Sequence, residues 1–87
     1  MHLKVLLPTE VLVDQEVGRV VAEAHNGSFG MLPRHIDFVA ALAPGILLYE
    51  TTDAEERYLG IDEGILVKCG DEVLVSSRSA VPGDDLH

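Results

Sequence analysis

The fold is decided by residues 64–75, which read GILVKCGDEVLV. Two runs with a period of two residues, 65–68 and 72–75, flank the turn-forming pair Gly70-Asp71. Successive side chains of a strand point to opposite faces, so each run is typical of a half-buried strand. Glycine supplies the positive φ that tight turns need. The stretch therefore predicts two strands joined by a short connection.

The same period recurs in residues 3–7 and 19–24. Turn signals interrupt the chain at short intervals, at Pro8-Thr9-Glu10, Asp14-Gln15, Asn26-Gly27-Ser28, Pro44-Gly45, Thr52-Asp53-Ala54, Asp62-Glu63-Gly64 and Pro82-Gly83-Asp84-Asp85. Residues 35–43 also allow a short helix, but their β-branched residues and the flanking prolines favour an extended chain. Many short strands at this spacing predict an all-β domain, a sandwich or a barrel.

Composition excludes several classes of protein. The 87 residues suffice for one small domain, and they carry a formal charge of −9 with 47% apolar residues. This charge argues against nucleic acid and anionic membranes as partners, since both need clusters of Lys and Arg. No apolar run is long enough to span a membrane, and residues 1–10 do not form a signal peptide. The single cysteine, Cys69, excludes an internal disulfide.

No motif indicates catalysis or metal binding. Cys69 could act in a small cysteine hydrolase only if it were reactive, and a filler role at a strand end is the commoner one. The four histidines, His2, His25, His35 and His87, lack the close spacing of zinc ligands. The glycine-rich segment 26–30 lacks the Lys-Ser/Thr of a P-loop. A lipoyl or biotinyl carrier would need a lysine at a hairpin tip, whereas Lys4 and Lys68 lie within strand patterns.

Residues 27–45 combine many apolar side chains with turn residues and scattered charges. A domain of this size has limited room for a core, so these side chains either complete the core or form an exposed surface for a protein partner.

The ordered set of segments resembles the epsilon subunit of F-type ATP synthases. Residues 27–45, GSFGMLPRHIDFVAALAPG, fit the family's G-x-x-G-apolar-apolar-P-x-H pattern followed by an apolar stretch ending in P-G. Residues 2–5 are similar to its first strand, 62–67 to its G-G-x-apolar-x-V hairpin, and 73–75 and 79–81 to its last strands. The pattern can be laid over residues 2–86 without a gap.

The resemblance implies a flattened β-sandwich of about ten short strands and a non-catalytic rotor role. In the family this domain lies in the central stalk, where it contacts the gamma subunit and the membrane ring of c subunits and helps couple ion-driven rotation to the catalytic head. His35, Ala40 and Leu42 match the face toward gamma. The loop Asn26, Gly27, Ser28, Phe29 and Gly30 matches the segment that meets the ring. The implied location is peripheral, on the cytoplasmic side of a bacterial cell membrane, and the ion, proton or sodium, stays open.

The sequence departs from the family pattern at three places. Phe29 stands where the family often has Glu, and Pro82 where it often has Arg. Family members usually continue into two C-terminal helices that in many bacteria bind ATP or inhibit hydrolysis. We therefore expect residues 1–82 to form the sandwich and 83–87 to begin the junction to an absent helical domain. This leads us to expect no cofactor, no nucleotide site, no insertion into the membrane and, in isolation, a capacity to dimerise. The carrier domain stays the alternative function.

Overall fold

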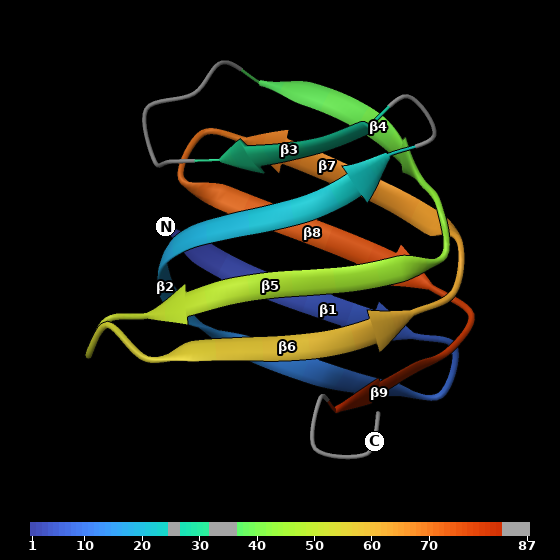
Figure 1. Ribbon diagram of the computed structural model, residues 1–87, viewed down its shortest axis with the longest axis horizontal. Coiled ribbons are helices and arrows are strands. Elements are labelled where there is room, and N and C mark those ends of the chain that lie inside the picture. The colour runs from blue at the N-terminus through green and yellow to red at the C-terminus, as the bar shows by residue number, and fades with distance from the viewer. Residues whose placement is uncertain (25–26, 32–36, 83–87) are drawn as a thin grey trace.

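The computed structural model describes residues 1–24, 27–31 and 37–82, and these fold into strands and turns (Figure 1). Nine strands follow one another along the described chain: β1 (His2–Leu7), β2 (Glu10–Ala24), β3 (Gly27–Met31), β4 (Phe38–Leu42), β5 (Gly45–Thr51), β6 (Glu56–Ile61), β7 (Gly64–Cys69), β8 (Glu72–Ser77) and β9 (Ala80–Pro82). The prediction of an all-β sandwich is confirmed. None of the described residues belongs to a helix that could cross a membrane.

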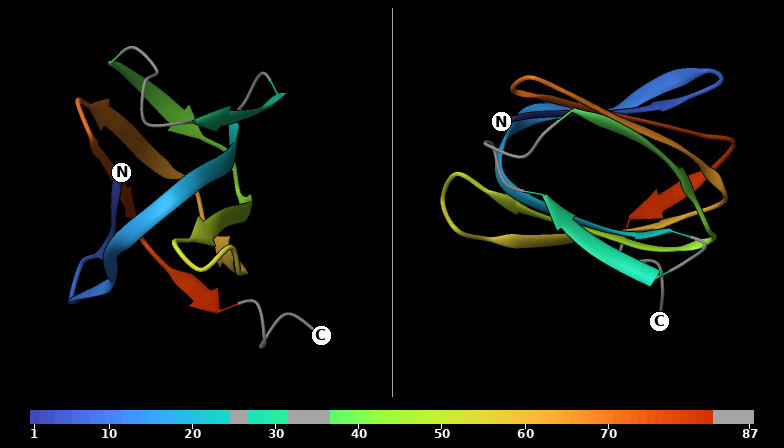
Figure 2. Two further views of the ribbon diagram at one scale, coloured as in Figure 1. Left: turned by 90° about the vertical axis from the view of Figure 1, so that its left-hand side faces the viewer. Right: turned by 90° about the horizontal axis from the view of Figure 1, so that it is seen from above.

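The strands form two layers that share β2. The hydrogen-bonded order is β1-β8-β7-β4-β2-β5-β6-β9, with β3 also paired to β2 and β1 paired to the first half of β2. Figure 2 shows β1, β7 and β8 in one layer, and β5 and β6 in the other. The pair β1–β8 is parallel, and the other pairs are antiparallel. We call the layer of β1, β8, β7 and β4 the first layer, and that of β5, β6 and β9 the second layer.

The long strand β2 joins the two layers because it bends. Val17 pairs with Thr51 and Arg19 with Glu50, so Gly18 is an extra residue in the ladder, which is a β-bulge. The predicted turn at Asp14-Gln15 is wrong, since both residues lie inside β2. Pairing with β1 keeps the chain extended there, because Gln15 lies opposite Leu3 and Asp14 opposite Lys4.

The core lies between the layers and is made almost entirely of aliphatic side chains. Its fully buried or nearly buried apolar members are Met1, Leu3, Val5, Val13, Val17, Val20, Ala22, Leu42, Leu47, Tyr49, Leu59, Ile61, Leu66, Val73 and Val75. Residues 38–42 are a strand, which confirms the extended interpretation for that part of the ambiguous stretch. The predicted alternation in 65–75 is present, because Leu66, Val73 and Val75 face inward while Ile65 and Leu74 face outward.

In the hairpin of β7 and β8 a glycine lies at each end, one in the turn and one at a close approach of the two backbones. Gly70, with φ of 59°, connects the strands as predicted. At the other end Gly64 pairs with Ser77, and a Cβ at Gly64 would overlap the carbonyl oxygen of Ser76. Only glycine fits this close approach of two backbones.

Candidate functional site

The first layer carries an exposed apolar surface on its outer side. Val39 of β4 is 69% exposed and Ile65 of β7 is 51% exposed. The register places Val39 beside Val67 and Val67 beside Leu74 of β8, while Ala41 lies beside Ile65. We call the outward side chains Val39, Ala41, Ile65, Val67 and Leu74 the docking face. A contiguous apolar surface of this kind is typical of a protein interaction site.

The structure corrects the predicted partner contacts on β4. Leu42 is 0% exposed and belongs to the core, so the prediction that its side chain faces a partner is wrong. Ala40 is half-buried and shares the inward side of β4 with Leu42, because side chains two residues apart lie on the same face. The predicted contact His35 lies outside the described residues. The outward neighbours Val39 and Ala41 were missed, although the period of two identifies them once Leu42 is placed inside.

The segment predicted to meet a membrane ring is mostly a strand. Gly27, Ser28, Phe29 and Gly30 belong to β3, which pairs with residues 20–24 of β2. The description of these four residues as a loop is therefore wrong, and they form one arm of a hairpin. Asn26 lies outside the described residues.

A groove lined by both charged and apolar side chains adjoins the docking face on the outer side of β1 and β8. It has a volume of about 580 Å³, and its lining includes His2, Lys4, Leu6, Asp71, Glu72 and Leu74. Leu74 belongs both to the groove and to the docking face, so the two surfaces are continuous. The groove thus adds charged groups to the rim of an apolar surface.

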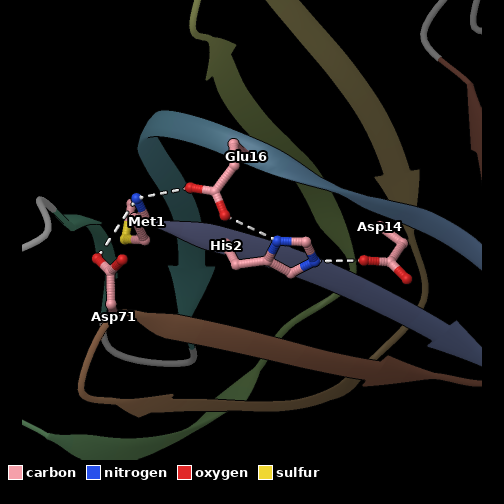
Figure 3. Close-up of polar contacts among 5 residues, drawn as sticks. All are labelled: Met1, His2, Asp14, Glu16 and Asp71. Carbon is pink, nitrogen blue, oxygen red and sulfur yellow. Dashed lines mark hydrogen bonds and ion pairs between the residues drawn. The ribbon is translucent and has the colours of Figure 1, made fainter.

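His2 is held between two carboxylates of β2 (Figure 3). Its Nδ1 lies 3.0 Å from Oε1 of Glu16, and its Nε2 contacts Oδ1 of Asp14. The hydrogen bonds with Asp14 and Glu16 raise the pKa of His2, because both ring nitrogens can donate only when the ring is protonated. The hydrogen bond from His2, and then that from the N-terminal amine, lowers the pKa of Glu16.

The N-terminal amine extends this cluster toward β8. It lies 3.3 Å from Oε2 of Glu16 and 3.4 Å from Oδ1 of Asp71. A backbone hydrogen bond also connects the two segments, since the amide of His2 donates to the carbonyl oxygen of Asp71 at 2.8 Å. The cluster therefore fastens β1 to both of its neighbours.

Lys68 and Cys69, the candidate residues for a carrier domain and for a cysteine hydrolase, both lie in β7. Lys68 is 1% exposed, and its Nζ donates to the carbonyl oxygen of Gly70. A carrier domain presents its lysine at an exposed hairpin tip, so the geometry of Lys68 contradicts that alternative. Cys69 is exposed and lies opposite Glu72 in the ladder. Among residues 1–24, 27–31 and 37–82, no three His, Cys, Asp or Glu residues are grouped to hold a metal ion.

The outer side of the second layer also carries apolar side chains. Ile46 of β5 is 40% exposed, and Tyr58 of β6 and Val81 of β9 are exposed to a similar degree. The register places Val81 opposite Gly60, which pairs with Ile46. The domain thus has apolar side chains on both outer sides, and Ile46 provides a counterpart to Ile65 on the opposite layer.

Comparison with known proteins identifies the family. The sequence profile described as "ATP synthase, Delta/Epsilon chain, beta-sandwich domain" matches residues 1–83. The chain is 36% identical to ATP synthase epsilon chain 2 of Paraburkholderia xenovorans and 33% identical to epsilon chain 2 of Cereibacter sphaeroides. These matches include 99% of this chain but 63% and 60% of the relatives, so the chain spans less than two thirds of their length.

Solved structures give the same result. A chain of the mitochondrial ATP synthase of Euglena gracilis superposes with a TM-score of 0.92 at 26% identity, over 98% of this chain and 54% of that chain. A chain from the central stalk and c-ring of the Tetrahymena thermophila mitochondrial ATP synthase has a TM-score of 0.81 at 12% identity and shares the fold. The chain therefore belongs to the family of ATP synthase delta/epsilon chains, and residues 1–83 are its beta-sandwich domain.

Proposed function

We propose that this chain is a non-catalytic central-stalk subunit of a rotary ATP synthase, which couples rotation of the membrane ring to the catalytic head. Membership of the delta/epsilon family supports this role, and so does the name that the curated relatives carry. The buried position of Lys68 argues against the alternative carrier function. The proposed location is peripheral, on the cytoplasmic side of the membrane that holds the complex.

The docking face is the observation that carries the proposal. Val39, Ile65 and Leu74 are large apolar side chains on three neighbouring strands, and all are open to solvent in the single chain. Permanent interfaces are apolar at their centre and polar at their rim. We assign this face to the gamma subunit, with Val39 and Ala41 taking the place of Leu42 in the contact.

The hairpin of β2 and β3 is proposed to face the ring of c subunits. Its backbone is held by five residue pairs, from Val20 with Met31 to Ala24 with Gly27. The antiparallel hydrogen bonds hold the two arms of the hairpin together. The contact itself is carried over from the family pattern at Asn26–Gly30.

Two matched variants test the gamma assignment. Ile65→Asp places a charge in the docking face, whereas Ile46→Asp places the same charge on the other layer. Calorimetric titration with purified gamma subunit should show binding that falls at least tenfold in Ile65→Asp, since a charge would be buried without a partner. Ile46→Asp should stay near the wild type.

Two other outcomes would contradict the proposal. If wild-type chain fails to bind gamma, the proposed function is wrong. If Ile46→Asp loses binding and Ile65→Asp keeps it, gamma binds the second layer and the docking face is misassigned. Thermal unfolding of both variants checks that each is folded, which is expected because both side chains are exposed.

A further inference from the structure

Val11 of β2 is an exposed apolar side chain outside the docking face, and a β-bulge sets its direction. It is 53% exposed. In the β1–β2 ladder Val5 pairs with Val13 and Leu6 pairs with Val11, so Leu12 is an extra residue in β2. Without this bulge, Val11 would lie on the same inward side as the buried Val13. The bulge instead packs Leu12 against the core and turns Val11 to the outer side.

A row of outward side chains connects Val11 with the docking face. Val11 lies beside Leu6 of β1, and Leu6 lies beside Ser76 of β8, a small uncharged residue. Ser76 in turn lies beside Ile65 of β7, which belongs to the docking face. Leu6 also lines the groove together with Leu74 of the docking face. Because cross-strand neighbours share one side of a sheet, the weakly polar surface continues from β4 to the first half of β2.

The neighbouring row, nearer the Gly70 turn, is charged. Glu72 of β8 lies beside His2 of β1, and His2 lies beside Glu16 of β2. Lys4 lies beside Asp14 between this row and Val11. Charged residues are depleted at the centre of an interface and are common at its rim. An interface that grows outward from the docking face therefore follows the row to Val11, and the charged residues form its rim.

The docking face alone is small for a lasting contact. Its five side chains lie on three strands, β4, β7 and β8. Stable interfaces bury about 800 Å² on each partner and use about 20–30 residues of each. Neighbouring strands lie about 4.8 Å apart, so the addition of β1 and β2 extends this surface from about 10 Å to about 19 Å across the strands. The row to Val11 thus supplies area that the docking face lacks.

We propose that the gamma contact continues from the docking face across β8 and β1 and ends on Val11. The inference rests on the proposed function, and it gives the extent of the interface and the chemistry of the partner. Gamma would present an uncharged, apolar surface about 19 Å long that crosses the strands. Gamma is the occupant because the row is continuous with the face assigned to it. A second copy is disfavoured, since two chains with a formal charge of −9 repel each other.

Two exposed valines provide a matched test. Val11 ends the proposed contact, whereas Val81, which is 42% exposed, lies on the outer side of the second layer. Val11→Asp and Val81→Asp add the same charge to each full chain. Calorimetric titration with purified gamma should show a Kd raised at least about tenfold in Val11→Asp, since the charge would be buried without a partner. Val81→Asp should stay within about twofold of the wild type.

A second measurement avoids the added charge. Val11→Cys and Val81→Cys are each combined with Cys69→Ser, because Cys69 is itself exposed. The rate of labelling by a maleimide is then measured with and without gamma. Gamma should slow the labelling of Val11→Cys at least about tenfold, since a covered thiol is inert, and should leave Val81→Cys unprotected. Thermal unfolding checks that Val11→Asp is folded, and the labelling result decides if it is not.

The outcomes distinguish the inference from the proposed function. If Val11→Asp behaves like Val81→Asp and Val11→Cys stays unprotected, while Ile65→Asp weakens binding, the inference is wrong and the proposed function stands. Equal loss of affinity in both Asp variants would show a general effect of charge and also overturn the inference. Protection of Val11→Cys at high concentration of the chain without gamma would identify a second copy as the occupant instead. Absence of binding by the wild type overturns the proposed function itself.

Discussion

Replacement of Gly64 by alanine should destabilise the domain through a backbone collision. A Cβ at this position would overlap the carbonyl oxygen of Ser76 and lie 3.1 Å from Cα of Ser77. Both are backbone atoms of the paired strand, so no side-chain rotation can relieve the contact. The β7–β8 ladder has to open locally, between the pair Gly64–Ser77 and the pair Ile65–Ser76.

The expected cost follows from three contributions. Overpacking that moves backbone costs about 1–3 kcal/mol. The buried hydroxyl of Ser77 donates to the turn, with the carbonyl oxygen of Asp62 at 3.0 Å, and its displacement loses a hydrogen bond of about 1 kcal/mol. Alanine restricts the unfolded chain and returns about 0.4–1 kcal/mol. The net loss is about 2 kcal/mol, a large share of the roughly 4–13 kcal/mol expected for a domain of 87 residues.

Gly18→Ala is the matched control, because Gly18 is also a strand glycine. Its Cβ would lie 3.7 Å from Oε1 of Glu50, which is ordinary contact, so this variant should gain about 0.4–1 kcal/mol. Urea unfolding at 25 °C followed by far-ultraviolet circular dichroism gives both values. Equal stability of Gly64→Ala and Gly18→Ala, with unchanged m values, would refute the close approach of β7 and β8 at Gly64.

Two further measurements test the core and the His2 cluster. Leu42→Ala should lower the free energy of unfolding by about 2–5 kcal/mol because Leu42 is fully buried, whereas Val39→Ala on the same strand should change it by less than about 0.5 kcal/mol. Small effects at both positions would show that the side chain of Leu42 lies on the surface. Because the pKa of His2 is raised in the folded state, the protonated ring stabilises the domain at acidic pH, and this contribution is lost as the pH rises through the pKa of His2. Because the pKa of Glu16 is lowered, the contribution of the Glu16 carboxylate is lost as the pH falls through the pKa of Glu16. Urea midpoints from about pH 5 to about pH 9 should therefore decline more for the wild type than for His2→Asn, and parallel curves would contradict the cluster.

Most of the fold could be predicted from the period of two. The strands of 64–75 and the short connection at Gly70-Asp71 follow from local patterns, because the alternation of side chains is visible within the sequence of each half-buried strand. Asp14-Gln15 misled the prediction, because a polar pair inside a strand has the same composition as a turn. Its extended form is fixed by pairing with β1 and by the contact of Asp14 with His2, which are tertiary effects.

The site could be predicted only in part. The family pattern indicates the strand that carries the docking face, but it names Leu42, whose side chain points into the core. Motif matching aligns positions in the chain and carries no information on which side of a strand a residue lies. The groove with Glu72 had no sequence signal, because it is formed by β1 and β8, which are paired across some 70 residues of chain.

The docking face is best understood from the two sides of β4 and β7. An antiparallel sheet with one side in water usually alternates apolar and polar residues. In β7, Leu66 and the buried Lys68 face the core while Ile65 and Val67 face outward, so apolar side chains lie on both sides of the strand. The same holds for β4, where Val39 and Leu42 lie on opposite sides. Strands that are apolar on both sides are typical of sheets covered on both sides. The core needs only one of these sides, so selection for folding alone does not explain Val39, Ile65 and Val67. A covering partner does, and this is why we assign the docking face to a lasting contact within the stalk.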